Sequence, residues 1–445
     1  MSTQEPQVKQ NLGPDVIRRR KIVLLVLLSV SAGVPLAFIR YNEPTATQTI
    51  TKVLAKTGSL VGTVLLVWQL ILGFRIVSTL FHRDLLWLVK LHERLGAAAI
   101  LLILLHPIFI PIYYAIKFDR SVLGLDLSDP FYWFVLAGMA TMALLLFIFV
   151  TSVFFRKKLG YGRWFATHLT TYLVLPLAFV HAFPIGMTLR ETPLNWYWML
   201  LAAVAGAVIL ARLLNVAGWR AYPHEVTNAH KLSEGVTELT MLPRQRPMEP
   251  HPGQFVYIRR RKAGSQRPYS VVRYDSDSGE ISIAARAGRD FSVRLQSVQP
   301  SERMYLDGPY GVFGQEALRT DRPLVMAAGG IGITAFLWML ETIEQNHDRP
   351  AYLFYGNLTT DRISYRRELD ALRYVRVVHV ISHQPDYPGE KGFITVELMR
   401  RYVGRELSEC EVLICGPPVM TEKLETQLLE AGVPTEQIHH ELFGF

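Results

Sequence analysis

Apolar residues dominate six long windows in the first half of the chain. The windows cover residues 22–38, 57–80, 85–116, 131–155, 164–183 and 196–214. A helix of about 20 apolar residues crosses the roughly 30 Å hydrocarbon core of a bilayer. A cleaved signal peptide is an alternative for the first window, but five further windows follow it and favour a membrane span. We therefore predict a six-helix transmembrane bundle over residues 21–217, after a cytoplasmic segment of residues 1–20.

In the second half of the chain, the apolar runs are short and separated by turn residues, as in a soluble protein. Alternating runs such as 254–258 and 280–284, separated by turn residues, predict a small antiparallel β-barrel over residues 221–318. Beyond it, apolar strands alternate with helical stretches, which predicts a doubly wound α/β domain over residues 319–445. The expected strands cover 324–328, 351–355, 375–381 and 412–415, and the expected helices cover 334–345, 364–372 and 395–402. The predicted fold class is therefore multi-domain, with an α bundle, a β-barrel and a parallel sheet.

Basic residues are concentrated in the loops on one side of the predicted bundle. They are Arg18, Arg19, Arg20 and Lys21 before the first window, and Arg156, Lys157, Lys158 and Arg163 between the fourth and the fifth. Cytoplasmic loops carry such an excess, so we expect the N-terminus and the whole second half in the cytoplasm. The net charge of +9 is explained by anionic lipid and phosphate-bearing cofactors, without nucleic acid. We expect an integral protein of a bacterial inner or plasma membrane, with no obligate protein partner.

Four histidines lie inside apolar windows, where an imidazole needs a partner. His92 and His106 are fourteen residues apart in the third window, and His168 and His181 are thirteen apart in the fifth. Each separation is roughly 20 Å along a helix axis. If the two helices face each other, His92 lies opposite His168 and His106 lies opposite His181. The sequence therefore predicts two stacked cages, each with two imidazoles.

The angular positions of these histidines fit one helix better than the other. Fourteen residues leave His92 and His106 only about 40° apart around an ideal helix, on one face. Thirteen residues leave His168 and His181 about 140° apart, which an ideal helix cannot reconcile. Pro176 lies between them, so we expect it to kink or rewind that helix.

Two motifs of the predicted barrel offer chemistry that suits a flavin. The run Arg267-Pro268-Tyr269-Ser270 puts a cation, a ring and a hydroxyl on one extended strand. Those groups can pair the flavin phosphates, stack on its ring and reach its redox nitrogen. The tetrapeptide alone would also fit an ordinary turn. The run 285–292 follows it, and Gly288 and Ser292 there can present backbone N–H groups to a pyrophosphate at a helix start.

A glycine-rich turn follows the expected strand 324–328. Gly329, Gly330 and Gly332 stand between this strand and a helix, where glycines let phosphates approach the backbone. Thr334 is placed to cap the helix. The turn therefore predicts a dinucleotide site.

The two cysteines of the chain, Cys410 and Cys415, are too few and too close to predict a disulfide framework or a metal cluster. Cys415-Gly416-Pro417 ends the strand 412–415, at the carboxyl edge of the sheet where ligands bind. We therefore expect this second turn to lie at the same edge of the sheet as the glycine-rich turn.

These motifs, in this order, resemble those of the ferredoxin-NADP reductase family. The resemblance is carried by residues 267–270, 308–311, 329–334, 415–417 and 441–445. With six spans ahead of them, the chain resembles the NADPH oxidase and ferric reductase family of transmembrane haem flavoproteins, in a prokaryotic form. In that family the third helix carries two haem ligands fourteen residues apart and the fifth carries two thirteen apart, and both spacings match.

The resemblance implies a role for each motif. Two b-type haems would be held by His92 with His168 and by His106 with His181, since imidazoles suit iron and the chain has no Cys-x-x-Cys-His. FAD would be held by Arg267, Pro268, Tyr269, Ser270, Gly288 and Ser292. NADPH or NADH would be held by Gly329, Gly330, Gly332, Thr334, Cys415, Gly416 and Pro417. Ser270, Cys415 and the terminal Phe445, which would stack on the flavin, would act directly in catalysis.

The implied function is electron transfer from cytoplasmic NAD(P)H through FAD and the two haems to an acceptor at the outer face. Oxygen, giving superoxide, is the first expectation. The animal oxidases carry another histidine one turn beyond the outer ligand, where this chain has Ile110, so a ferric chelate is an alternative. Two further classes stay open: a membrane-anchored flavin reductase serving a cytoplasmic partner, and a haem-binding scaffold without dehydrogenase activity.

Overall fold

The structure, a computed structural model, describes residues 14–81, 84–119, 121–264, 266–288, 290–315 and 317–442. It divides into a helical unit, Asp15–Leu213, and a second unit that contains Leu214–Phe445. The limits of the three predicted domains remain predictions.

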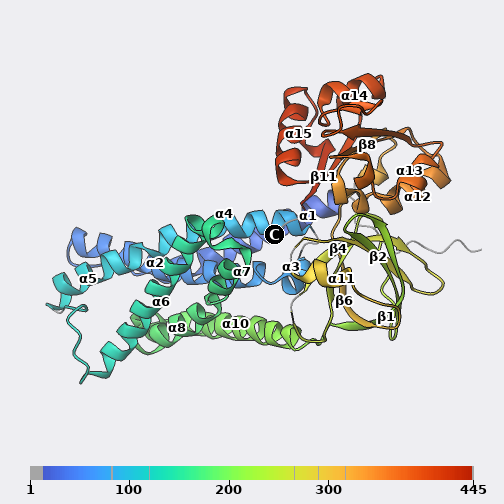
Figure 1. Cartoon of the computed structure of the whole chain (residues 1–445). Coiled ribbons are helices and arrows are strands. Elements are labelled where there is room, and N and C mark those ends of the chain that lie inside the picture. Colours follow the sequence, from blue (N-terminus) through green and yellow to red (C-terminus); the bar gives the residue numbers. More distant parts are fainter. Residues whose placement is uncertain are drawn as a thin grey trace, which may run out of the picture. The chain divides into compact units, whose positions relative to one another are not determined.

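The helical unit consists of long apolar helices joined by short helical segments (Figure 1). Its elements are α1 (Pro14–Gly33), η1 (Val34–Phe38), α2 (Ala46–Leu72), α3 (Arg75–Phe81), α4 (Leu85–Ile103), α5 (Leu105–Phe118), α6 (Pro130–Val153), α7 (Arg156–His168), α8 (Thr171–Ile185), α9 (Met187–Glu191) and α10 (Leu194–Val216).

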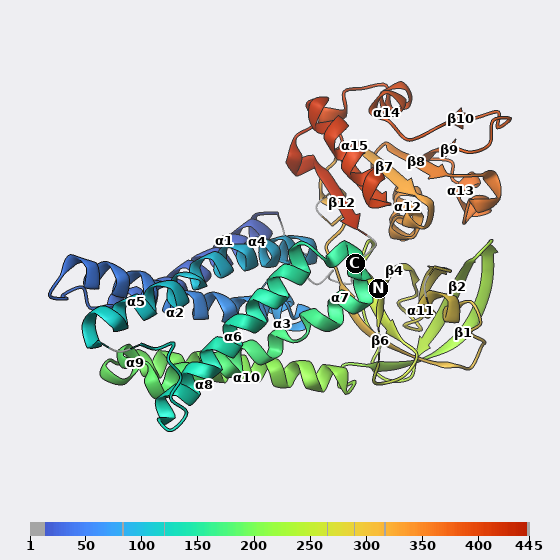
Figure 2. The ribbon, with the colours of Figure 1, turned by 60° about the vertical axis from the view of Figure 1, so that its left-hand side comes forward.

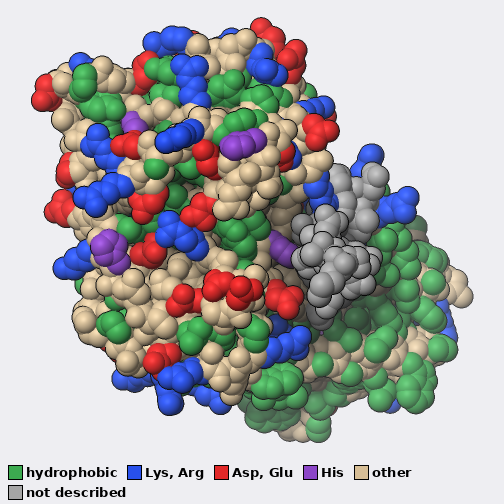
Figure 3. Space-filling model, turned by 90° about the vertical axis from the view of Figure 1, so that its right-hand side faces the viewer, with side chains coloured by type: hydrophobic (Ala, Val, Ile, Leu, Met, Phe, Trp, Pro, Cys, Tyr) green, Lys and Arg blue, Asp and Glu red, His purple; other side chains and the backbone are tan. Residues whose placement is uncertain are grey.

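Six helical stretches among the described residues are long and apolar enough to cross a membrane. They are Arg18–Phe38, Ala46–Leu72, Trp87–Phe118, Pro130–Val153, Gly162–Ile185 and Leu194–Val216. Large exposed hydrophobic side chains are concentrated in this unit, and Figure 3 shows an area of this kind with few charges. The chain is therefore an integral membrane protein.

The second span differs most from its prediction of 57–80. Its helix begins at Ala46, where the Thr45 side chain accepts a hydrogen bond from the Gln48 N–H, and ends at Leu72. The prediction began too late because Lys52 and Lys56 lower the apolar average of the first turns. It ended too late because the chain breaks at Gly73 before α3.

Two sets of helices pack inside the helical unit. Helix α2 runs beside α4 and α5, and α6 runs beside α8 (Figure 2). Buried apolar side chains, among them Val64, Trp68 and Trp198, fill the core of the unit. This arrangement brings the third and the fifth spans into the same bundle.

The second unit begins with a closed antiparallel barrel of strand order β1-β2-β5-β4-β3-β6. Its strands are β1 (Tyr222–Ser233), β2 (Val236–Pro243), β3 (Phe255–Arg259), β4 (Arg267–Tyr274), β5 (Ile281–Arg286) and β6 (Arg303–Tyr310), with α11 (Asp290–Leu295) between the last two. Alternating side chains such as Leu239, Ile258 and Ile283 fill the interior, as the sequence pattern predicts.

A parallel sheet of order β10-β9-β8-β7-β11-β12 follows the barrel. Its strands are β7 (Leu324–Gly329), β8 (Ala351–Asn357), β9 (Arg376–Ile381), β10 (Glu390–Lys391), β11 (Glu411–Gly416) and β12 (Ile438–Leu442). Its α-helices are α12 (Leu337–Asn346), α13 (Arg366–Asp370), α14 (Val396–Val403) and α15 (Pro418–Glu430). The three predicted parts of the fold, the helical bundle, the barrel and the doubly wound sheet, are confirmed.

The strand order of this sheet reverses beside β7. The chain passes from β7 to β8 on one side, and later returns to β11 on the other side of β7. Ligands of open α/β sheets bind at such a switch point, at the carboxyl ends of the strands. The ends of β7 and β11 are the glycine-rich turn and Cys415-Gly416-Pro417.

Candidate functional site

The four histidines of the helical unit form two pairs. The ring centres of His92 and His168 are 6.1 Å apart, with the ring planes at 71°. Those of His106 and His181 are 6.0 Å apart, with the planes at 74°. The structure thus brings together the partners that the spacing suggested, and the two pairs have nearly the same geometry.

Backbone carbonyls orient both imidazoles of one pair. The Nδ1 atom of His106 lies 3.2 Å from the carbonyl oxygen of Ala55, and that of His181 lies 2.8 Å from the carbonyl oxygen of Phe134. A carbonyl oxygen can only accept, so each Nδ1 carries the proton and donates it. Each Nε2 therefore keeps a free lone pair, which is the arrangement of metal-binding histidines.

The other pair is oriented less firmly. His168 Nδ1 lies 3.3 Å from the Ser152 hydroxyl, and the His168 ring stacks on Trp164 with centres 5.2 Å apart. His92 Nδ1 is buried and has no hydrogen-bond partner among the described residues. The tautomer of His92 is therefore not fixed by a contact of this kind.

Glycines on neighbouring helices give the rings their space. A Cβ atom on Gly138 would lie 2.5 Å from His181 Nδ1, closer than real contacts allow. A Cβ atom on Gly73 would lie 3.3 Å from His92 Cε1. Gly58 leaves space for the backbone of the helix that carries His106, since a Cβ atom on Gly58 would lie 2.9 Å from the backbone nitrogen of His106.

The helix break between His168 and His181 lies at residues 169–170 and not at Pro176, which the sequence suggested. Helix α7 ends at His168, α8 begins at Thr171, and Pro176 lies inside α8. The Thr170 N–H donates to the Thr167 carbonyl, and the Tyr172 N–H donates to the Leu169 carbonyl, so the turn is tightened to the 3₁₀ type. Each such residue advances about 120° instead of 100°, which reduces the 140° mismatch.

The third span is also interrupted, at Leu104 between α4 and α5. Pro107 follows three residues later and has no N–H to donate to the Ile103 carbonyl. The apolar pattern of residues 85–116 predicted a single helix here.

The predicted flavin motif lies on β4, and its side chains pass from exposed to buried along the strand. Arg267 and Pro268 are exposed, Tyr269 is partly buried, and Ser270 is buried opposite Phe255 of β3. Burial raises the pKa of Tyr269 to about 12, with Arg267 opposing the shift. The Tyr269 phenol is therefore neutral at physiological pH.

The two predicted residues of the second flavin motif, Gly288 and Ser292, are hydrogen-bonded to each other. The Gly288 N–H donates to the Ser292 hydroxyl at 3.0 Å, across the start of α11. Before Gly288 could donate to a pyrophosphate, Ser292 would have to release it. The roles of both residues remain a prediction.

The glycine-rich turn packs directly on the turn after β11. A Cβ atom on Gly332 would lie 2.1 Å from the Cys415 carbonyl oxygen, and one on Gly329 would lie 2.7 Å from Pro417. Gly330 has a φ of +54°, which favours glycine. The structure therefore brings the two predicted nucleotide motifs together at the switch point.

The prediction that Thr334 caps the following helix is wrong. Residues Gly330–Ala335 form a 3₁₀ turn, and α12 begins one residue after Phe336, which has no capping side-chain bond. The Thr334 hydroxyl instead donates to the Ile331 carbonyl at 2.9 Å. The tight turn leaves Thr334 too early in the chain to reach the first N–H groups of α12.

Cys415 is fully buried in the core of the α/β domain. Burial raises the pKa of its thiol well above the usual range, and Glu441 adds to the shift. A neutral thiol can fill space beside a ligand, but it is not an acid or a nucleophile at neutral pH. Phe445, the third predicted catalytic residue, lies outside the described residues.

The contact between Arg286 and the glycine-rich turn was not predicted from the sequence. Arg286 ends β5, and a Cβ atom on Gly330 would lie 3.2 Å from one of its guanidinium nitrogens. Its Nε atom is buried without a partner among the described residues. A cation at the end of an alternating strand was the available signal, but nothing in the sequence linked it to a turn 44 residues later.

Two family models match separate parts of this chain. Residues 58–179 match the ferric reductase like transmembrane component, and residues 326–426 match the oxidoreductase NAD-binding domain. The chain has the domain make-up of the NADPH oxidase and ferric reductase family. This finding confirms the resemblance inferred from the motifs, and the chain is an oxidoreductase with a ferric reductase-like membrane domain.

Individual relatives cover only about half of this chain. The toluate 1,2-dioxygenase electron transfer component of Pseudomonas putida is 27% identical over 233 residues, which are 50% of this chain and 68% of that protein. NADH–cytochrome b5 reductase 1 of Arabidopsis thaliana is 25% identical over 228 residues, which are 48% of this chain and 80% of that protein. A solved structure, the ferredoxin reductase in carbazole 1,9a-dioxygenase, is 25% identical, with a TM-score of 0.46 over 50% of this chain and 69% of that one.

Proposed function

We propose that this chain transfers electrons from cytoplasmic NAD(P)H through FAD and two b-type haems to an acceptor at the outer face of the membrane. Oxygen, which would give superoxide, is the first candidate acceptor, and a ferric chelate is the second. The observation that carries the proposal is the pair of matched imidazole cages, His92 with His168 and His106 with His181, in a membrane domain of the ferric reductase type.

The spacing of the imidazoles fits a metal between them. An imidazole nitrogen binds a first-row metal at about 2 Å, and the ring centre lies about 1 Å behind that nitrogen. Two imidazoles on opposite sides of one metal therefore have ring centres about 6 Å apart, close to the 6.1 and 6.0 Å between these rings.

The number of ligands favours haem over a bare metal ion. Among the described residues, no three His, Cys, Asp or Glu side chains come together as a metal-binding group. Two axial imidazoles suffice only where another group fills the remaining positions of the metal, as a porphyrin does. When bound, haem would supply one-electron redox chemistry at each cage.

The residues of the helical unit would hold and orient these groups. The carbonyls of Ala55 and Phe134 keep the Nε2 lone pairs of His106 and His181 directed into their cage. Ser152 and Trp164 position His168 in the other cage. Apolar helices around both cages would exclude water.

In the second unit, we propose that β4 together with Gly288 and Ser292 binds FAD and that the turns after β7 and β11 bind NAD(P)H. Ser270 would lie beside the flavin ring, and Arg267 would pair its phosphates. Arg286 adds a cation over Gly330, where the pyrophosphate of the dinucleotide would lie. The relatives named as an electron transfer component and an NADH–cytochrome b5 reductase support a nicotinamide donor.

The optical spectrum of the purified full chain, before and after addition of NADH or NADPH, tests this proposal. We expect a low-spin bis-histidine haem spectrum that becomes reduced under nitrogen and is reoxidised by oxygen, with trapped superoxide. A protein without haem would instead support a membrane-anchored flavin reductase. Haem that NAD(P)H never reduces would support a scaffold without dehydrogenase activity.

A further inference from the structure

A polar pocket of about 330 Å³ lies at the end of the bundle where α2 begins and α5 ends. The loop charges predict that this end faces outward. Its charged lining consists of four cations and two carboxylates, Arg40, Lys52, Lys56, Lys117, Glu43 and Glu191. Two positive charges are therefore uncompensated within it.

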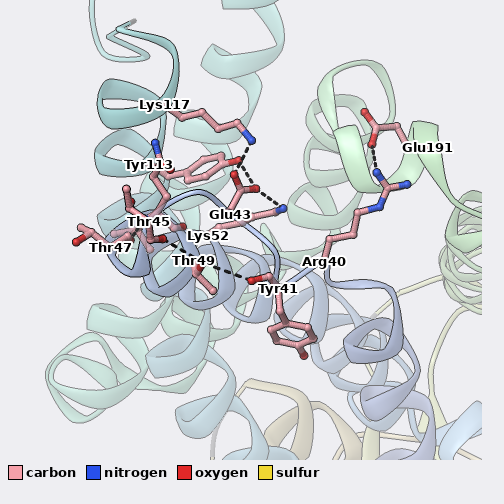
Figure 4. A network of polar contacts seen from close by, with 12 residues as sticks. Arg40, Tyr41, Glu43, Thr45, Thr47, Thr49, Lys52, Tyr113, Lys117 and Glu191 are labelled. Atoms are coloured by element: carbon pink, nitrogen blue, oxygen red, sulfur yellow. Dashed lines mark hydrogen bonds and ion pairs between the residues drawn. The ribbon is translucent and has the colours of Figure 1, made fainter.

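Two of the cations are held by one buried carboxylate. The Nζ atoms of Lys52 and Lys117 lie 2.5 and 2.6 Å from the oxygens of Glu43, and the Tyr113 hydroxyl donates to Glu43 at 3.1 Å (Figure 4). The Glu43 side chain is only 3% exposed. These contacts lower the pKa of Glu43 to about 2, Lys117 contributing most, so the carboxylate stays ionised. Lys52, Lys117 and Tyr113 thus hold one carboxylate of the protein itself, by charge-assisted bonds, in the lining of the pocket.

A third cation is satisfied at the rim of the pocket. Arg40 lies 3.4 Å from Glu191, and both side chains are largely exposed. Such an exposed pair contributes little and opens at little cost. Arg40 is therefore available to a second anion.

Lys56 is the cation that lacks a partner. It lies one turn after Lys52 on α2 and lines the pocket, but its ammonium has no hydrogen bond or ion pair among the described residues. An ammonium inside a membrane span is costly unless an anion or water compensates it. Lys56 directly follows Ala55, whose carbonyl oxygen lies 3.2 Å from His106 Nδ1, so the lysine is close in the chain to a residue that contacts this imidazole.

The position of these lysines also conflicts with the usual distribution of charge. Basic residues favour the cytoplasmic ends of spans, whereas these line a pocket at the opposite end. Ile110, one turn after His106, lines the same pocket. The pocket therefore has an excess of positive charge that an anion would compensate, and it lies near the His106 and His181 cage.

We propose that this pocket binds a small di- or tricarboxylate, with Lys56 and Arg40 as its cationic partners beside Lys52 and Lys117, which share the single carboxylate of Glu43. A free anion and the ligand shell of a ferric ion both present such carboxylates, and the chemistry of recognition is the same. Binding itself rests only on the pocket. The claim that such an anion accompanies the electron acceptor rests on the proposed function.

Binding of citrate to the purified full chain, measured by calorimetry without NAD(P)H, tests the site. We expect Lys56→Gln to weaken citrate binding about tenfold, because it removes one charge-assisted bond. Glu43→Gln should strengthen binding, because it releases Lys52 and Lys117 for the ligand. Lys158→Gln, which removes a charge from the predicted cytoplasmic side, should bind citrate as the wild type does.

The opposite signs of the two pocket variants keep the test decisive. A gain of affinity in Glu43→Gln cannot come from misfolding. Absence of citrate binding to the wild type, or equal loss in Lys56→Gln and Lys158→Gln, would overturn the proposal. Ferric citrate binding more tightly than citrate, with the same dependence on Lys56, would identify the ferric chelate as the source. Tighter binding of citrate alone would identify the free anion. Since none of these measurements needs haem reduction, their failure is distinct from failure of the proposed function.

Discussion

Glycine serves different purposes in the two candidate sites of this chain. In the helical unit, Gly138 and Gly73 leave room for the side chains of His181 and His92. In the second unit, Gly332 lets the turn after β7 meet the backbone of the turn after β11. The first site thus depends on particular side chains held at a fixed place, and the second depends largely on backbone N–H groups and turn shape. Loss of an imidazole should therefore abolish haem binding at its cage, whereas substitutions in the nucleotide site should weaken binding by degrees.

The largest expected effect comes from removing an imidazole. His106→Leu should leave the chain with one haem instead of two, because a single axial histidine does not hold the group in an apolar span. Flavin reduction by NAD(P)H should persist, since that chemistry belongs to the other unit. Haem per chain, from the absorbance of its pyridine complex, measures the effect. The control is His230→Leu, which removes an exposed histidine of β1 and should retain two haems. Two haems in His106→Leu would refute the assignment.

A second large effect should follow from filling the space beside His181. Gly138→Ala places a methyl group where only 2.5 Å separates it from the ring, so the ring must move. Such overpacking costs typically ~1–3 kcal/mol and should lower the haem occupancy of the cage formed by His106 and His181. Gly206→Ala is the matched control on α10, since, apart from its chain neighbours and the nearby backbone of its own helix, no described atom lies within 4 Å of its added methyl group. Equal haem content and thermal stability in both variants would show that the glycine is incidental.

Arg286→Gln should produce a graded effect in the nucleotide site. Loss of one charge-assisted bond to a phosphate costs about 1.5–3 kcal/mol, so we expect the KM for NAD(P)H to rise by about 10- to 100-fold. The kcat value should change little, because backbone turns still position the nicotinamide. Steady-state kinetics with a soluble artificial acceptor measure both. Arg294→Gln, on the exposed face of α11, is the control. A fall in kcat with unchanged KM would assign Arg286 another role.

The sequence predicted the parts of these sites that repeat at fixed intervals. The spacing of histidines in apolar windows and of glycines between a strand and a helix can be read from the sequence. The periodicity of apolar residues likewise predicts the six spans and the doubly wound sheet. Contacts between distant segments are not visible in this way. The carbonyls of Ala55 and Phe134, which orient His106 and His181, belong to residues with no chemical signature.

The errors have similar physical causes. Pro176 was a reasonable site for a helix break, but a proline can remain within a helix when neighbours support it, and the turn tightened at residues 169–170 instead. Thr334 had the right residue type for a cap but lies within a 3₁₀ turn. Lys52 and Lys56 shortened the predicted second span, although both line the polar pocket where α2 begins. Rules based on residue type therefore failed where a 3₁₀ turn in the neighbouring backbone determined the outcome.

The smallest effect should distinguish the two imidazole cages from each other. His168 is oriented by the Ser152 hydroxyl at 3.3 Å, a longer contact than the carbonyl bond of His181 at 2.8 Å. Loss of such an outer partner typically costs 10- to 100-fold in metal affinity, and we expect Ser152→Ala to lie near ~10-fold because its bond is long. Haem retention during dilution, followed optically, measures this change.

The control for Ser152→Ala is Thr141→Val on the same helix, whose hydroxyl bonds only to the Ala137 carbonyl among the described residues. Thr141→Val should retain both haems, because that bond lies within α6 and reaches no imidazole. If Ser152→Ala also leaves haem retention unchanged, stacking on Trp164 must be enough to orient His168. The two cages would then differ in kind: carbonyl bonds would orient one, and an aromatic contact would orient the other.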